Sequence, residues 1–123
     1  MRRDMDLVRK ILKLVESQET ALNVGWDLAV DGYTDEQIGY HIHLMGQAGL
    51  VVAIDSTTMS NTSPSAIAAS LTWQGHDFLE SIKDDDLWAK AKKHVLMPAG
   101  GAAFSVLTDW IKAEAKQRLG LPP

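Results

Sequence analysis

The spacing of apolar residues predicts that the chain begins with an amphipathic helix over residues 4–17. Asp4 stands where an N-cap residue is expected, directly before the first apolar positions. The apolar stripe consists of Leu7, Val8, Ile11, Leu12, Leu14 and Val15. In residues 24–30 the apolar positions alternate instead, which predicts a strand that ends in an Asp31-Gly32 turn.

A second helix is predicted over residues 34–48. Thr34 and Gln37 form a capping box, in which each side chain satisfies a free backbone amide at the helix start. Gly49 suits the left-handed position that ends a helix. Two strands follow, over residues 50–55 and 66–71, and the polar loop between them predicts a hairpin.

The last third of the chain returns to a helical period. Thr72 is a candidate N-cap, and Gly75 on the apolar face would let a neighbouring segment pack closely. Asp84, Asp85 and Asp86 start the next helix, and a final helix is predicted over 102–119. The aromatic residues on inferred apolar faces are predicted to pack in the core: Trp26, Trp73, Phe78, Trp88 and Phe104.

This order of elements predicts an α+β fold that is winged-helix-like, with additional C-terminal helices. We expect a single domain over 1–123, with the winged-helix-like core in 1–83 and a helical extension in 84–120. The predicted strand at 24–30 occupies the place of the second helix of a helix-turn-helix. Either the helix 34–48 serves alone, or a very short turn replaces the missing helix.

Three stretches also resemble a known family: "RRDMDLVRKIL", "GYTDEQIGYHIHLMGQAGLV" and "LTWQGHDFLESIKDDDLWAKAK". They are similar to domain of unknown function 2513, a family of small bacterial and phage proteins, over roughly residues 1–95. The resemblance implies a winged-helix-like fold and an association with phages or mobile elements. It implies no activity and therefore no catalytic residues.

The composition of the chain excludes several kinds of functional site. The chain has no cysteine, which excludes disulfides, thiolate nucleophiles and thiolate metal sites. Its N-terminus mixes charged and apolar residues without an uninterrupted apolar run, so neither a signal peptide nor a membrane span is predicted. We expect a cytoplasmic protein without a cofactor.

The distribution of charge bears directly on nucleic-acid binding. All 12 Lys and Arg lie either before Leu14 or after Ile82, whereas the segment between them carries nine Asp and Glu. Since Lys and Arg supply most non-specific affinity for DNA, a DNA-binding surface in that segment is disfavoured. Candidate nucleic-acid contacts are Arg2, Arg3, Arg9, Lys10 and Lys13 on the first helix, and Tyr40, His43 and Gln47 on the second.

The histidines have simple structural interpretations. His41 and His43 lie two positions apart on a helix, where their side chains diverge by about 200° and cannot chelate one ion. We expect His41 at the half-buried edge of the apolar face, and His43 facing outward beside Gly39 and Gly46. His76 and Glu80 are one turn apart on the outer side of their helix and form a candidate functional surface.

The final helix carries a stripe that is predicted to form a homodimer: Phe104, Leu107, Trp110 and Ile111. We therefore expect a non-enzymatic interaction or regulatory module that binds another protein as well as itself. The alternative is a DNA-binding transcriptional regulator that uses the basic first helix. A small metal-dependent or hydrolytic enzyme at His76 and Glu80 is a weaker third hypothesis.

Overall fold

In the computed structural model, the N-terminal apolar stripe lies on helix α1 (Met5–Glu16) and is buried as predicted, except for the half-buried Leu14. The Asp4 carboxylate caps this helix by accepting hydrogen bonds from the backbone N–H groups of Asp6 and Leu7, at 2.9 and 3.3 Å. Leu7, Ile11 and Leu12 are completely buried. The helix is thus held by its cap at one end and by its apolar face along its length.

The structure describes residues 1–18, 28–97 and 103–122. These residues form a mixed α+β fold that divides into two units, Met1–Asp77 and Phe78–Pro123. The division falls within α3 (Trp73–Ile82). The expected single domain with a boundary at residue 83 stays a prediction.

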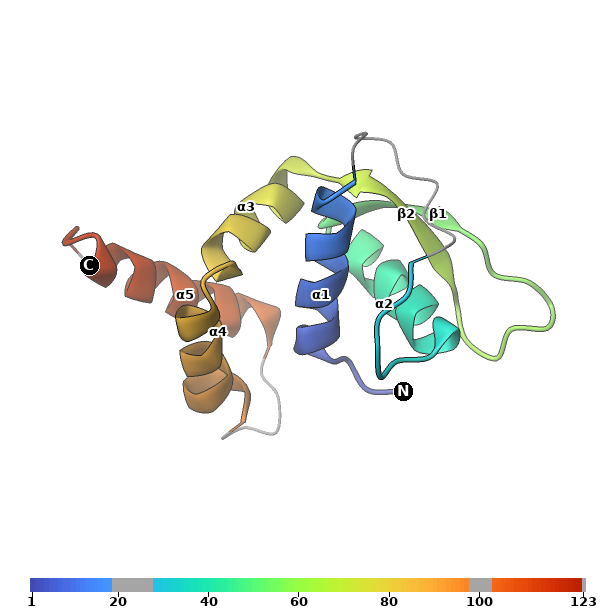
Figure 1. Ribbon diagram of the computed structural model, residues 1–123, viewed down its shortest axis with the longest axis horizontal. Helices are drawn as coiled ribbons and strands as arrows, with labels where there is room; N and C mark the ends of the chain where they lie inside the picture. Colours follow the sequence, from blue (N-terminus) through green and yellow to red (C-terminus); the bar gives the residue numbers. More distant parts are fainter. Residues whose placement is uncertain (19–27, 98–102, 123) are drawn as a thin grey trace. The chain divides into compact units, whose positions relative to one another are not determined.

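The first unit contains the predicted second helix and hairpin. Helix α2 (Asp35–Gln47) begins with the capping box, in which the backbone N–H of Gln37 donates to Thr34 Oγ1 at 3.1 Å. It ends at a left-handed Gly49, whose φ is +75°. Strands β1 (Val51–Asp55) and β2 (Ala66–Leu71) then pair antiparallel, and their connecting loop extends away from α1 (Figure 1).

The strand predicted at residues 24–30 falls largely on residues 24–27, which lie outside the described residues. The remaining part, residues 28–30, adopts no regular structure, so the prediction is wrong for these three positions. Within the described ranges the sheet consists of β1 and β2.

Two glycines bring α2 into close contact with the hairpin. A Cβ atom at Gly39 would lie 2.2 Å from Ser65 Oγ, and one at Gly46 would lie 2.6 Å from the Ala53 Cβ. The prediction that these glycines share an outward face with His43 is therefore wrong for Gly39 and Gly46. Their lack of a side chain is what allows the helix to lie directly on the hairpin.

A buried polar network joins α1 to α2. His41 is only 2% exposed, which is deeper than the half-buried position predicted for it. Its Nε2 accepts the Asp4 backbone N–H at 2.9 Å, and its Nδ1 lies 2.8 Å from the Gln37 carbonyl oxygen. Because an amide can only donate, Nε2 is unprotonated and Nδ1 carries the hydrogen. The Tyr33 hydroxyl completes the network by donating to Asp4 Oδ2 at 2.8 Å.

The start of α3 is fastened to the turn between α2 and β1. Thr72 Oγ1 donates to the Gly49 carbonyl at 2.5 Å and accepts the Gly75 N–H at 2.9 Å, which confirms Thr72 as the N-cap. The Thr72 N–H donates to the Leu50 carbonyl at 3.1 Å. A Cβ at Gly75 would lie 1.9 Å from that same oxygen, so Gly75 is the close-packing position that the sequence predicts.

The second unit is helical. Asp84 caps α4 (Asp85–Ala91), as predicted, by accepting the Leu87 N–H at 2.9 Å. A π-helical turn, η1 (Lys92–Leu96), continues this helix, and α5 (Phe104–Arg118) follows it in the chain. The buried side chains of the unit include Leu79, Ile82, Trp88, Leu107 and Ile111. Phe78 and Phe104 meet edge to face, with ring centroids 4.9 Å apart.

Replacing Gly75 by Ala should destabilise the protein by about 1–3 kcal/mol, because the new methyl group would clash with the Leu50 carbonyl. Chemical denaturation would measure this change in the free energy of unfolding. The matched control is Gln74→Ala on the same, exposed turn, for which a change within about 0.5 kcal/mol is expected. Equal stabilities for the two variants would show that this close contact is not rigid.

Stability should fall as the pH rises from 10 to 12, in part through Tyr33. Burial, the hydrogen bond to Asp4 and the negative charges of Asp4 and Asp6 raise the pKa of Tyr33 from 10.0 to about 12. A folded-state pKa above the unfolded one means that this stabilisation is complete below pH 10 and is lost through the window above it. Urea titrations of wild type and Tyr33→Phe should show a shallower alkaline decline for the variant. Parallel declines would contradict this role of Tyr33.

Candidate functional site

Residues of α2 and the hairpin form a continuous polar and aromatic surface. We call it the α2–hairpin surface and define it by Glu36, Tyr40, His43 and Gln47 of α2 together with Asp55 and Thr62 of the hairpin. The Tyr40 and His43 rings stack with their centroids 6.2 Å apart and an interplanar angle of 25°. Gln47 Nε2 lies 3.4 Å from His43 Nε2, and the Thr62 hydroxyl donates to Glu36 Oε1. The three candidate contacts on α2 are therefore brought together.

Local hydrogen bonds hold the hairpin loop in shape. The Thr57 backbone N–H donates to Asp55 Oδ1 at 3.0 Å, and its hydroxyl donates to the Ser65 carbonyl at 3.1 Å. Farther along the loop, Asn61 Oδ1 accepts the Thr58 N–H at 2.6 Å. These bonds order a loop whose Met59 side chain is fully exposed.

The α2–hairpin surface is negatively charged. Hydrogen bonds from Thr57, and secondarily the nearby His43, lower the pKa of Asp55 below its ordinary value. Asp55 is therefore ionised at neutral pH. In the described part of the chain, no Lys or Arg forms an ion pair with Asp35, Glu36 or Asp55. A surface of this kind favours cationic groups and repels phosphate.

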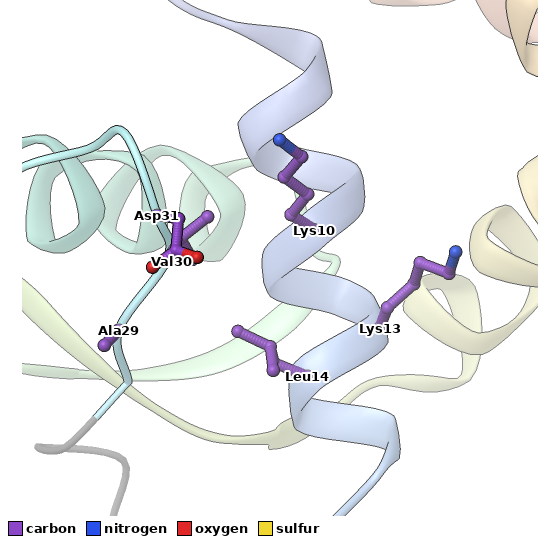
Figure 2. Close-up of a pocket in the computed structure, with 6 residues that line it drawn as sticks. All are labelled: Lys10, Lys13, Leu14, Ala29, Val30 and Asp31. Atoms are coloured by element: carbon purple, nitrogen blue, oxygen red, sulfur yellow. The ribbon is translucent and has the colours of Figure 1, made fainter.

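The basic residues of α1 lie elsewhere in the first unit. Lys10 and Lys13 are exposed, and Lys10 Nζ lies 5.5 Å from the centroid of the Tyr33 ring. Both line an open hollow of about 390 Å³ together with Leu14, Ala29, Val30 and Asp31. Figure 2 shows Leu14 directed toward residues 29 and 30, whereas Lys13 points away from them. The two ammonium groups therefore do not converge on one point.

The remaining candidate contacts on α1 are Arg2, Arg3 and Arg9. Arg2 and Arg3 are exposed, Arg9 is half-buried, and each takes part in an interaction within the chain. A nucleic-acid surface on α1 would therefore depend most directly on Lys10 and Lys13.

Helix α3 exposes residues that the sequence assigned differently. Trp73 is 80% exposed, so its predicted place in the core is wrong. It is the first residue of α3, and the Thr72 and Gly75 contacts turn other positions inward. His76 is exposed as predicted, whereas Glu80 accepts a hydrogen bond from Lys83 Nζ at 2.9 Å instead of pairing with His76.

The predicted dimer stripe of α5 is only partly exposed. Leu107 and Ile111 are each 1% exposed, and Phe104 packs on Phe78. Trp110 is half-buried and stacks with His94 at 6.1 Å. The homodimer stays a prediction, but these four side chains do not form the open stripe expected for it.

Two structural properties of the described residues bear on the class of site. Among the described residues, no group of three or more His, Asp or Glu side chains is arranged to hold a metal ion. None of the helices within those ranges combines the length and apolar character needed to cross a membrane.

Sequence patterns indicate only the α2 part of the α2–hairpin surface, where the helical repeat places Glu36 on the same outward side as Tyr40, His43 and Gln47. No sequence pattern groups Asp55 or Thr62 with these residues. Their grouping depends on the close packing of α2 against the hairpin. The glycine spacing Gly39 and Gly46, seven residues apart on one helix face, is the sequence signal that could have indicated it.

Comparisons with known proteins define the family. A family model described as "Hypothetical protein (DUF2513)" matches residues 2–102. The chain belongs to this family, which confirms the resemblance seen in the sequence. An uncharacterized protein of Haemophilus influenzae is similar to it, with 41% identity over 95 residues, covering 75% of this chain and 76% of the relative. No solved structure matches the chain.

The exposure of Trp73 predicts a sharp contrast between two tryptophans. Trp73→Ala should change the free energy of unfolding by less than about 0.5 kcal/mol, since little apolar area is buried there. Trp88 is 3% exposed, so Trp88→Ala should lower the free energy of unfolding by about 3–5 kcal/mol. Denaturant titrations of the two variants would test this, and a large loss at Trp73 would place it in a core.

Proposed function

We propose that the protein is a non-enzymatic, winged-helix-like interaction module, and that it binds another protein through the α2–hairpin surface. The order of α1, α2 and hairpin supports the winged-helix-like assignment, since a helix leads directly into a two-stranded wing. The family's expected association with phages or mobile elements is compatible with a regulatory role.

One observation carries this proposal: the surface combines stacked aromatic rings with carboxylates that form no ion pair with Lys or Arg among the described residues. In a DNA-binding winged helix, the helix before the wing usually enters the major groove, where acidic side chains near its N-terminus would lie close to phosphates. Here that position holds Glu36, while Asp55 lies at the base of the loop. Protein interfaces readily use tyrosine and complementary charge, so a protein is the better occupant.

DNA binding through α1 is the second candidate. The exposed Lys10 and Lys13 favour it, because two cations on one helix can contact neighbouring phosphates. Asp31 beside the same hollow opposes it. This candidate leaves the α2–hairpin surface without a role.

A binding experiment separates the two candidates. We expect no shift of a random duplex of about 30 bp by about 10 µM protein at low salt, since the favourable contacts to phosphate are few. A shift that disappears in Lys10→Glu/Lys13→Glu would establish the second candidate instead of the first.

Site-specific photocross-linking in cells tests protein binding at the α2–hairpin surface. A cross-linker placed at the exposed Gln47 should yield a discrete adduct with another protein. The adduct should be lost in Tyr40→Ala, while the same cross-linker at Gln117 on α5 should not yield it. Absence of an adduct at Gln47, or its persistence in Tyr40→Ala, would count against the proposed interface.

A further inference from the structure

The α2–hairpin surface has features that select the chemistry of its partner. Two of its own residues, Glu36 and Asp55, are carboxylates, and Asp35 precedes Glu36 in the chain. None of the three forms an ion pair with Lys or Arg in the described part of the chain. Hydrogen bonds hold two of them in place: Thr62 donates to Glu36, and Thr57 donates to Asp55. Carboxylates fixed in this way lose little conformational freedom when a cation binds.

The aromatic pair adds a second requirement. The half-buried Tyr40 stacks on His43, so its ring is held along the helix rather than free in solvent. A planar guanidinium group can stack on such a ring and donate hydrogen bonds to a carboxylate at the same time. A lysine ammonium group can pair with the carboxylate but lacks the planar shape that stacks.

The dimensions suit a short peptide segment. Glu36 and Gln47 are eleven residues apart on α2, which corresponds to about 16 Å along the helix axis. An extended segment of about five residues spans that length. We propose that the α2–hairpin surface binds an arginine-bearing segment of a partner protein, with a guanidinium group on Tyr40 and the carboxylates around it. This inference rests on the proposed function and names the chemistry of its partner.

The charge distribution of the chain supports this choice of partner. The segment from Leu14 to Ile82 contains no Lys or Arg, so neither α2 nor the hairpin supplies a neutralising cation. A Lys or Arg that pairs with this surface must therefore come from α1, from the second unit, from another copy of the chain or from a different protein. Lys10 is already placed over the Tyr33 ring.

A peptide titration of the ¹⁵N-labelled full chain tests the inference. The probe is the acetylated nine-residue peptide Gly-Arg-Gly-Arg-Gly-Arg-Gly-Arg-Gly amide, with lysine and glutamate versions for comparison. The arginine peptide should shift the amide signals of Tyr40, His43 and Asp55, and should bind about threefold more tightly than the lysine peptide. The glutamate peptide should leave these signals unchanged.

Matched charge removals distinguish a defined site from diffuse attraction. Glu36→Gln and Asp55→Asn should each weaken arginine-peptide binding by about three- to fivefold. Asp31→Asn and Asp77→Asn remove the same charge outside the surface and should change it by less than about 1.5-fold. Tyr40→Ala should remove the preference for arginine over lysine. If it disturbs the fold, as a loss of dispersion of the amide signals would reveal, Tyr40→Leu replaces it.

Several results would overturn the inference. Equal weakening by all four charge variants would show only diffuse attraction. Signal changes at this surface with rising protein concentration, in the absence of peptide, would identify a second copy as the occupant. Binding of the glutamate peptide here would exclude an arginine-bearing partner but leave protein binding in place. Shifts of the same signals by duplex DNA would instead contradict the proposed function itself.

Discussion

The close approach of α2 to the hairpin is the constraint on which the first unit depends. Gly39 is buried against Ser65, and Gly46 lies against Ala53, so the helix axis is held near the strands at two points. His43 lies between these two glycines in the helix sequence. It is close enough to Asp55 to contribute to the lowered pKa of that carboxyl. A larger residue at either glycine would push the helix outward and separate the groups that form the α2–hairpin surface.

The polar network between α1 and α2 acts together with this contact. The Asp4 carboxylate caps its own helix and accepts the Tyr33 hydroxyl, while its backbone N–H reaches His41. Each group satisfies hydrogen-bonding atoms that burial would otherwise leave without partners. Because hydrogen bonds are directional, the network sets the orientation of α1 more narrowly than apolar packing alone. The most buried histidine is consequently a structural residue.

Local patterns predicted the elements of the fold well, because their signals lie within a few residues of each other. The capping box at Thr34, the cap at Asp84 and the two strands of the hairpin all form as predicted. Apart from the strand predicted at residues 28–30, the errors concern relations between distant residues. Helical periodicity placed Trp73 on an apolar face, but the contact of Thr72 and Gly75 with residues 49 and 50 decides which side of α3 is turned inward.

The candidate site shows the same division. Tyr40, His43 and Gln47 could be grouped from the helical repeat alone, since they lie three or four residues apart. Asp55 and Thr62 could not, because their position depends on how the hairpin packs against α2. The stripe on α5 is a related case. The helical repeat predicts the apolar stripe itself but does not predict which side chains pack against it. Two of the side chains predicted to face another copy, Leu107 and Ile111, are buried, and a third, Phe104, packs on Phe78.

The stretch "LTWQGHDFL", which lies in one of the three segments that carry the family resemblance, illustrates why a specific sequence need not mark a functional site. Thr72 and Gly75 are required by the contact with Gly49 and Leu50, since a hydroxyl must reach one carbonyl and a bare Cα must pass beside the other. Steric demands of this kind restrict residue type as strongly as catalysis does. Trp73 and His76, the residues with distinctive chemistry, lie exposed on the outer side of the same turn. The residue types in this stretch are therefore explained by the contact that Thr72 and Gly75 make with Gly49 and Leu50. The α2–hairpin surface, which is assembled from residues far apart in sequence, is the stronger candidate for function.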